Sequence, residues 1–144
     1  MKFSAAAIVA AAAAGVNANA AFEVKDFSAS CIPHSTFCDY SFKVIQPNSM
    51  ETWENAVKCQ AHVQSTNYLL PDVYNGKCEG SSRTFDISHT KKGLVFTVKQ
   101  QVTPKSFTTG RRTIPNKQLT QATTPNAEIQ SYKGPKEFEL TQIN

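Results

Sequence analysis

Four cysteines and three histidines are the residues of this 144-residue chain that could do chemistry. Cys31 and Cys38 enclose His34 in the stretch CIPHSTFC, and Cys59 is followed three residues later by His62. Thiolate and imidazole groups bind zinc, and paired thiols also form redox couples or structural disulfides. The compartment in which the protein folds helps to decide among zinc binding, redox chemistry and structural disulfides.

The spacing of these residues argues against zinc and redox chemistry. Zinc motifs typically place two cysteines two to four residues apart, with a second ligand pair downstream. Here six residues separate Cys31 from Cys38, and no Cys-x-x-Cys redox motif occurs. We therefore expect no metal and no cofactor, with zinc bound by CIPHSTFC, or by a mixed site that includes His62, as the weaker alternative.

The N-terminus predicts a secretory leader. Met1-Lys2 is a short positive region, an apolar run of twelve residues covers Ala5 to Val16, and small residues follow at Ala18 and Ala20. This order is typical of a signal peptide, and the run is too short for a membrane span. We expect residues 1–20 to be removed, with cleavage after Ala18 as the alternative, and residues 21–144 to form one soluble, extracellular domain.

Secretion favours disulfides, because the extracellular compartment is oxidising. Four cysteines allow three pairings. We favour Cys31–Cys38 and Cys59–Cys78, because each of these bridges closes a local loop between neighbouring segments.

Charge and composition argue against binding to nucleic acid or to membranes. The sequence has 15 basic and 11 acidic residues, a net charge of +4, and its basic residues are scattered. Nucleic-acid binders instead gather basic residues on one face with aromatic residues between them. We expect a solvated surface and no nucleic-acid or membrane partner.

Alternation of polar and apolar residues predicts strands. In DYSFKVIQ, Tyr40, Phe42 and Val44 fall on one side, with Ser41 and Lys43 on the other. This period of two is typical of half-buried antiparallel strands. We expect strands at 22–27, 39–46, 83–88, 93–102 and 136–143, and an all-β antiparallel sandwich or barrel of about eight strands.

Two segments are less regular. Residues 50–63 fit either a helix or a strand, and we favour a strand over 55–64 because alternation continues to Val63. Residues 103–126 are rich in Thr and contain three prolines, which predicts short edge strands joined by exposed turns.

No catalytic motif is found. Gly-x-Ser-x-Gly and the glycine-rich phosphate loops are absent, and the cysteines are assigned to bridges. His34, His62 and His89 are scattered along the chain, and RTFDISH at 83–89 is a weak indication of a ribonuclease. We predict that the protein is not an enzyme, with a secreted hydrolase or ribonuclease as an alternative.

Several short stretches resemble a known family. The order ASC, CDYSFKV, VKCQA, YNGKCEGSSRTFDIS, GLVFTVKQQV and GPKEFEL, over about residues 22–141, is similar to the secreted fungal family of the Alternaria major allergen. That family includes the hypersensitive-response-inducing protein elicitors. The resemblance implies an all-β, disulfide-bonded barrel-like sandwich without catalytic machinery, and it supports the Cys59–Cys78 bridge.

The resemblance also implies partners. It points to a secreted effector or elicitor that binds plant components in the apoplast, such as a thaumatin-like defence protein, and to a small phenolic ligand as an alternative. This chain has no cysteine after Cys78, so the C-terminal bridge of the allergen branch is missing. Because Cys38 offers Cys31 a partner within the chain, we expect a monomer.

Exposed loops on a rigid sheet are the expected recognition surface. We predict the loops at 65–77 and 104–117, because Tyr and Arg are frequent anchors of interfaces. The candidate partner-binding residues are Tyr68, Leu69, Leu70, Tyr74, Arg111 and Arg112. Alternatively, the first loop folds onto the core and the second is a solvated basic turn.

Overall fold

Ten strands and one short 3-10 helix make up the part of the chain that the structure describes. The computed structural model describes residues 19–67, 69–124 and 127–143, with the backbone alone for 121–124 and 127–128. No helix among these residues is long and apolar enough to cross a membrane. The strands are β1 Ala20–Cys31, β2 Phe37–Ile45, β3 Val57–Gln64, β4 Val73–Cys78, β5 Thr84–Thr90, β6 Gly93–Thr103, β7 Ser106–Pro115, β8 Leu119–Thr124, β9 Ala127–Tyr132 and β10 Phe138–Ile143, with the helix at Asn116–Gln118.

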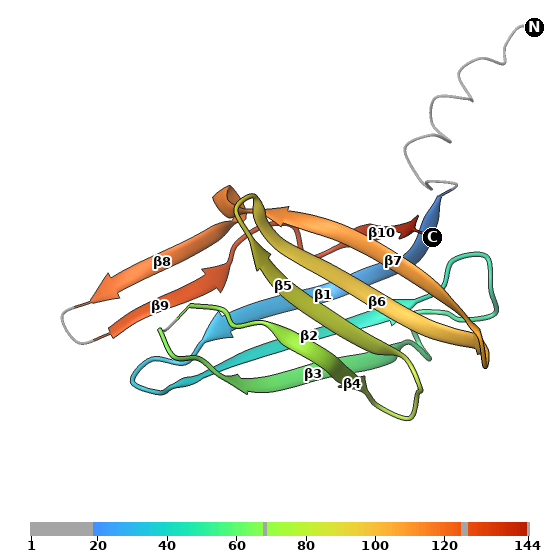
Figure 1. Ribbon diagram of the computed structural model, residues 1–144, viewed down its shortest axis with the longest axis horizontal. Coiled ribbons are helices and arrows are strands. Elements are labelled where there is room, and N and C mark those ends of the chain that lie inside the picture. The colour runs from blue at the N-terminus through green and yellow to red at the C-terminus, as the bar shows by residue number, and fades with distance from the viewer. Residues whose placement is uncertain (1–18, 68, 125–126, 144) are drawn as a thin grey trace, which may run out of the picture.

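Eight of these strands close into an antiparallel barrel (Figure 1). The order around the barrel is β10-β7-β6-β5-β4-β3-β2-β1, and pairing of β1 with β10 completes the ring. β9 and β8 continue the sheet beyond β1 as a hairpin, the β8–β9 arm, which projects from the barrel. The predicted all-β fold of about eight strands with two disulfides is confirmed, and its closed form is a barrel.

β2 shows how the sequence produces these strands. Tyr40, Phe42 and Val44 are buried, while Ser41 and Lys43 between them are only half-buried and lie on the outer side. The strand predicted at 39–46 is therefore confirmed with its inner and outer faces. The other predicted alternating segments form β1, β5, β6 and β10.

β1 is bent by a bulge. Its register against β2 shifts between Lys25 and Ser28, and Asp26 has a φ of 56°. A bulge lets a strand turn and re-aims its side chains. Phe22 lies inside before the bulge and Phe27 after it, so β1 can pair with β10 in its first half and reach β9 in its second.

Aromatic rings fill the middle of the barrel. The Phe42 ring lies 4.9 Å from both Phe85 and Phe96, and Phe27 lies 5.2 Å from Phe96, measured between ring centroids. Phe138 packs edge-on against Phe27 at 5.4 Å. Barrels of eight strands are just wide enough for side chains to fill. The interior of this barrel is therefore a packed core.

The uncertain segment at 50–64 divides into a loop and a strand. β3 begins at Val57 and pairs with β2 along its whole length, so the preferred strand is confirmed over the helix. Trp53 lies in the preceding loop, which connects β2 to β3.

Both segments predicted as binding loops are partly strands, so the prediction of loops was wrong there. In each segment the cause is a glycine that lies within a strand. Asn75 and Gly76 belong to the loop predicted at 65–77, but they form a bulge within β4. A Cβ on Gly76 would lie 2.4 Å from the Phe85 ring, and one on Gly110 in β7 would lie 2.9 Å from Leu140. Both glycines permit close packing inside a strand rather than a turn between strands.

Both predicted disulfides are present. Cys31 is bonded to Cys38, and Cys59 to Cys78. Each bond joins residues directly opposite one another on neighbouring antiparallel strands. The first bridge therefore fastens β1 to β2, and the second fastens β3 to β4.

A buried ion pair closes one end of the barrel, which we call the Arg83 end. The Arg83 side chain is 3% exposed, and its two Nη atoms donate to the Glu51 carboxylate at 3.2 and 2.9 Å. Its Nε donates to Gln100 Oε1 at 2.9 Å, one Nη also reaches the Val44 carbonyl at 3.5 Å, and the guanidinium lies 5.2 Å from the Phe22 ring. Almost every donor of this arginine has a partner.

An apolar side chain closes the opposite end, which we call the Leu70 end. Leu70 lies in the β3–β4 loop and is fully buried. Its backbone N–H donates to Gln130 Oε1 on β9 at 2.8 Å. The hydroxyl of the buried Tyr40 donates to the Pro71 carbonyl at 2.6 Å. These bonds hold the loop across the opening.

Candidate functional site

The first predicted binding loop is mostly occupied with closing the barrel. Leu70 belongs to the core, so its prediction as a surface anchor is wrong, and Leu69 beside it is half-buried. Tyr68 lies outside the described residues. Tyr74 lies on β4 rather than in a loop, and it is 73% exposed.

The second predicted loop is mostly the strand β7, which places its two arginines on a rigid wall. Arg111 is exposed, and its Nε donates to the Thr97 hydroxyl at 3.3 Å. Arg112 is half-buried, with its guanidinium 4.8 Å from the Phe138 ring. β5 and β6 separate Tyr74 from Arg111, so the structure does not bring the two predicted loops together. A binding role for Tyr74 and Arg111 stays a prediction.

One histidine forms a pair with an aspartate on the outer side of β2 and β3. His62 Nδ1 lies 2.5 Å from Asp39 Oδ1, and its ring stacks on Phe37 at 4.4 Å with an interplanar angle of 4°. An ionised carboxylate can only accept, so Nδ1 is the donor of this bond. Both partners of the pair are exposed.

A second histidine–aspartate pair lies beside Tyr74. Asp72 Oδ1 accepts from the His89 backbone N–H at 2.9 Å and lies 3.1 Å from His89 Nδ1, and Asp72 Oδ2 accepts from the Tyr74 hydroxyl at 3.2 Å. Partial burial raises the pKa of Asp72, but these hydrogen bonds and the His89 charge lower it by a larger amount. The pKa of Asp72 is therefore below its ordinary value of 3.8. The hydrogen bond that Tyr74 donates to Asp72 raises the pKa of the Tyr74 hydroxyl. His34 is exposed between β1 and β2, so it joins neither pair.

Three hollows lie on the outer side of four neighbouring strands, β10, β1, β2 and β3, which we call the β10–β3 face. The largest, of about 500 Å³, surrounds the Asp39–His62 pair, and another, of about 230 Å³, lies between Asp26 and Lys58. These two share Ser41 and Gln60, so they adjoin. The third hollow has the indole ring of Trp53 in its lining.

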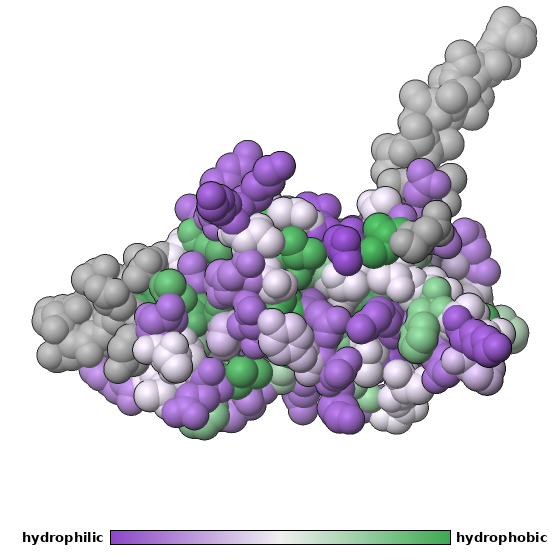
Figure 2. Space-filling view, in the orientation of Figure 1, coloured by the Kyte–Doolittle hydropathy of each residue, from purple (hydrophilic) through white to green (hydrophobic). Residues whose placement is uncertain are grey.

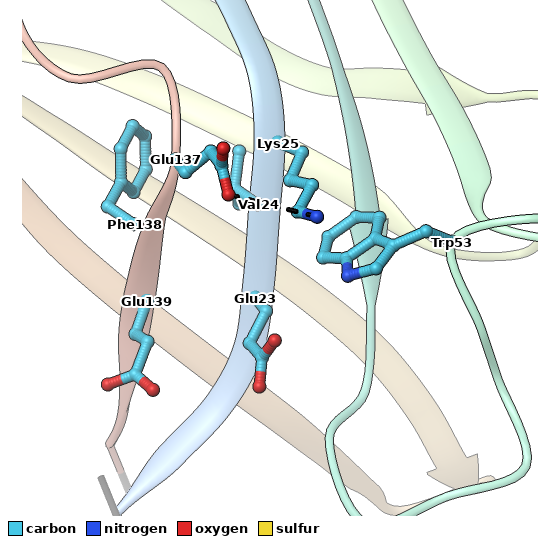
Figure 3. Close-up of a pocket in the computed structure, with 7 residues that line it drawn as sticks. All are labelled: Glu23, Val24, Lys25, Trp53, Glu137, Phe138 and Glu139. Atoms are coloured by element: carbon cyan, nitrogen blue, oxygen red, sulfur yellow. Dashed lines mark ion pairs between the residues drawn. The ribbon is translucent and has the colours of Figure 1, made fainter. Parts of the chain in front are cut away.

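This third hollow, the Trp53 pocket, has a volume of about 330 Å³ and lies between β10, β1 and the β2–β3 loop. Lys25 lies between Glu137 and Trp53 (Figure 3): its Nζ is 3.8 Å from the Glu137 carboxylate and 4.8 Å from the centre of the indole ring. This arrangement fixes one wall of the pocket. The lining residues are Glu23, Val24, Lys25, Trp53, Glu137, Phe138 and Glu139.

Two carboxylates lie next to one another in this pocket. Glu23 on β1 and Glu139 on β10 are directly opposite in the strand register, and Figure 3 shows both side chains pointing to the same side. Like charges directly opposite one another on neighbouring strands destabilise a sheet. Three glutamates and one lysine give the pocket a formal charge of −2, in a chain whose net charge is +4. The pocket is therefore suited to a cationic group that also stacks on an aromatic ring.

Sequence reasoning missed the Trp53 pocket. The alternation over 136–143 predicts only a strand there, which β10 confirms. Nothing in the pattern shows that Glu139 lies beside Glu23, because that contact depends on closure of the barrel by its first and last strands. Among the described residues, no three His, Cys, Asp or Glu side chains are placed to hold a metal ion.

Comparison with known proteins identifies the fold. No protein-family model matches the chain, and no curated protein matches it by sequence. Two crystal structures of the Alternaria alternata major allergen Alt a 1 are similar to it in structure. One of them has a TM-score of 0.51 and 13% sequence identity, and the match covers 85% of this chain and 91% of the allergen. The other has a TM-score of 0.52 and 14% sequence identity, and the match covers 90% of this chain and 93% of the allergen.

Proposed function

We propose that this chain, which has the fold of the Alternaria allergen Alt a 1, is a secreted effector or elicitor that binds a host protein without catalysing a reaction. Its similarity to that allergen suggests a fungal, allergen-like protein. The observation on which the proposal rests is the Trp53 pocket, where an aromatic wall and a local charge of −2 open on the outer surface of a closed, packed barrel.

The packed interior favours surface recognition over a ligand held inside the barrel. Phe42, Phe85 and Phe96 are in mutual contact at the centre and are at most 3% exposed. A phenolic ligand of ordinary size would have to displace several of these rings. The hollows of the β10–β3 face are open without any rearrangement.

The histidine–aspartate pairs lack the nucleophile of a catalytic triad. A nucleophilic triad requires a hydroxyl or thiol hydrogen-bonded to the histidine. In the described part of the chain, His62 and His89 bond through their side chains only to Asp39 and Asp72, and all four cysteines are in disulfides. Neither pair is therefore part of a nucleophilic triad.

The chemistry of the Trp53 pocket suggests what the host protein presents. A Lys or Arg side chain would place its cation between Glu23 and Glu139 and its alkyl part against Trp53. We propose a basic patch on an apoplastic plant protein as the partner, with the thaumatin-like defence proteins implied by the family resemblance as the first class to test.

The test begins with the secreted mature protein as bait in apoplastic fluid of a host plant. The affinity of the captured protein is then measured for the unaltered chain and for a Glu23→Lys, Glu139→Lys variant. Reversing both charges should weaken binding at least tenfold, or about 1.4 kcal/mol, and Trp53→Ala should weaken it as well.

A matched control is Glu54→Lys, which reverses an exposed charge next to Trp53 in the chain but outside the pocket lining. This variant should bind like the unaltered protein. The proposal fails if no plant protein is captured, or if the pocket variant and the Glu54 variant bind equally well.

A further inference from the structure

The two adjoining hollows of the β10–β3 face lie over a set of polar side chains, and we call them together the Gln60 site. On β1, β2 and β3 the residues between the more buried ones point to the outer side of the barrel, where they meet in two rows across the three strands. Strands in a sheet are about 4.8 Å apart, so the side chains of one row can contact a single ligand. The rows are Ser28, Ser41 and Gln60, and Ser30, Asp39 and His62.

The side chains of the Gln60 site can both donate and accept hydrogen bonds. The Ser41 hydroxyl is 2.9 Å from the Ser28 hydroxyl, and Asp39 accepts from His62. Gln60 lies where the two hollows meet, and its side chain makes no hydrogen bond to any other described residue. Its amide therefore keeps two donors and a carbonyl acceptor for a ligand.

The charges around the Gln60 site balance. The smaller hollow is lined by two acids and two lysines, so its formal charge is zero, and Lys43 Nζ lies 3.5 Å from the Asp26 carboxylate. In the larger hollow the one acid, Asp39, is already paired with His62. The Trp53 pocket, by contrast, has a formal charge of −2. An ion therefore gains little at the Gln60 site, whereas a neutral ligand with hydroxyl groups can use both the donors and the acceptors.

Few apolar side chains face the Gln60 site. Tyr40, Phe42 and Cys59 line it, but their side chains are at most 3% exposed because they point into the core. Among the lining residues His62 alone brings a ring to the outer side, and that ring is stacked on Phe37. A lipid or a phenolic compound would therefore bury little apolar surface here.

An extended peptide is also a poor match, because the strands beneath the site are internal. β2 is paired with β1 and β3, and β3 is paired with β2 and β4. Their backbone N–H and C=O groups are therefore used within the sheet, and a peptide strand would find none to pair with. A ligand of the Gln60 site must bond to side chains.

Both disulfides hold the strands of the site in place. Cys38, next to Asp39, is bonded to Cys31 on β1, and Cys59, next to Gln60, is bonded to Cys78 on β4. The polar side chains are therefore carried by a cross-linked backbone. A preorganised site loses less conformational freedom on binding, which matters for a ligand that is held mainly by hydrogen bonds.

We propose that the Gln60 site binds a neutral oligosaccharide. Sugar hydroxyls both donate and accept, and they would bond to Gln60, Ser41 and Asp39, with one sugar ring stacked on the His62 ring. The larger hollow alone, of about 500 Å³, is within the size range of small-molecule sites. This site shares no lining residue with the Trp53 pocket, so the proposal goes beyond the binding of a host protein and does not depend on it.

The test is isothermal titration calorimetry of the secreted protein with four neutral hexasaccharides, which are cellohexaose, laminarihexaose, xylohexaose and hexa-N-acetylchitohexaose. At least one of them should bind with a Kd below about 1 mM. Its Kd should be the same at about 0.05 and 0.5 M salt, because the ligand has no charge that salt could screen. The anionic hexagalacturonate should bind more weakly than that sugar.

The double variant Asp39→Ala, Gln60→Ala should weaken binding of that sugar at least tenfold. Gln60→Ala alone removes no hydrogen bond between described side chains and should weaken binding about threefold. The matched control, Glu54→Ala with Gln101→Ala, removes a carboxylate and an amide at exposed positions outside both hollows. It should bind like the unaltered chain.

The proposal is overturned if none of the four sugars binds at about 1 mM, if hexagalacturonate binds more tightly than all of them, or if the Gln60 variants bind as tightly as the unaltered chain. Trp53→Ala should leave sugar binding unchanged. Failure of sugar binding and failure of host-protein binding are therefore distinguished by separate variants.

Discussion

At the Arg83 end of the barrel a charged side chain is paired with Glu51 in the opening, whereas at the Leu70 end a hydrocarbon side chain fills it. Each of the two closing residues belongs to a connection between strands, and each half of the barrel has one disulfide nearby. The two ends therefore differ chiefly in the kind of interaction that closes them. Figure 2 shows that hydrophobic side chains are scattered among hydrophilic ones on one side of the molecule.

The interactions that close the two ends differ in how strongly they depend on the direction of their partners. The guanidinium of Arg83 bonds to groups from the β2–β3 loop, β2 and β6, and each bond requires its partner at a particular angle. Leu70 needs only a cavity of the right size, because hydrophobic burial is not directional. We infer that the Arg83 end fixes the relative positions of its segments, whereas the Leu70 end tolerates any apolar side chain of similar volume.

The largest effect is expected from Arg83→Met, which keeps apolar length but removes the charge. Glu51 would then lose its ion-pair partner at a partly buried position, and Gln100 Oε1 would lose its donor. Breaking such a pair on one side typically costs about 3–5 kcal/mol. Urea unfolding with the disulfides intact should show a loss of about 4 kcal/mol in the free energy of unfolding.

The double variant Arg83→Met, Glu51→Leu separates the ion pair from the packing. Removing both leaves no unpaired charge, although Gln100 Oε1 still lacks its donor and the Gln46 amide lacks its acceptor, so the double variant should be more stable than Arg83→Met alone. A double variant that is less stable than either single one would show that the Arg83 end is not held mainly by the pair.

Leu70→Ala should have the next largest effect, of about 3 kcal/mol, because it leaves a cavity at the other end of the barrel. Leu70→Met keeps the volume and should cost less than about 1.5 kcal/mol. Leu69→Ala, at the half-buried neighbouring position, is the control and should cost less than about 1 kcal/mol. If Leu70→Met were as costly as Arg83→Met, the proposed contrast between the two ends would be wrong.

These two ends also show what could be predicted from the sequence. Alternation within one segment, such as Tyr40, Phe42 and Val44, predicts a strand and its buried face correctly, because both depend on neighbouring residues. The disulfides could be predicted because each joins cysteines close in the sequence. Leu70 and Arg83 were not identified as closing residues, because their partners come from distant segments such as Gln130 and Glu51.

The glycines and the candidate site show a second limit on what could be predicted from the sequence. Asn75-Gly76 has the composition of a turn, but Gly76 is needed under the Phe85 ring inside β4. A turn and a strand bulge use the same residues, so local sequence does not distinguish them. The opposition of Glu23 and Glu139 likewise depends on closure of the barrel, which no segment encodes alone.

Tyr40→Phe should have a smaller and more local effect at the Leu70 end. Burial, with a further contribution from the Asp72 charge, raises the pKa of Tyr40, so its hydroxyl stays a neutral donor to the Pro71 carbonyl. Loss of one such hydrogen bond costs about 1 kcal/mol. Hydrogen exchange at the Leu69 and Leu70 amides should accelerate more than exchange at the amides of β5 and β6. Equal acceleration everywhere would show that the loop does not open separately.

The smallest effect is the dependence of the Arg83 end on acid. Partial burial raises the pKa of Glu51, but hydrogen bonds from Arg83 and the Gln46 amide, with the Arg83 charge, lower it to below the ordinary 4.5. A carboxyl group whose pKa is lower in the folded state stabilises the fold above its unfolded pKa. That contribution is fully present at neutral pH and is lost as pH falls through the folded pKa, below 4.5.

Glu51→Gln isolates this contribution, because glutamine keeps the shape but does not titrate. The difference in free energy of unfolding between the unaltered chain and Glu51→Gln should be constant from pH 7 to about 5.5 and shrink below 4.5. Asp72→Asn is the matched measurement at the Leu70 end, where hydrogen bonds also lower the pKa of Asp72 from 3.8. Asp72 is 37% exposed and its partner His89 is 42% exposed, whereas Arg83 is 3% exposed. Water screens the exposed pair more strongly, so the acid-dependent difference should be larger for Glu51 than for Asp72. An equal or larger change for Asp72 would show that burial of Arg83 does not distinguish the electrostatics of the two ends.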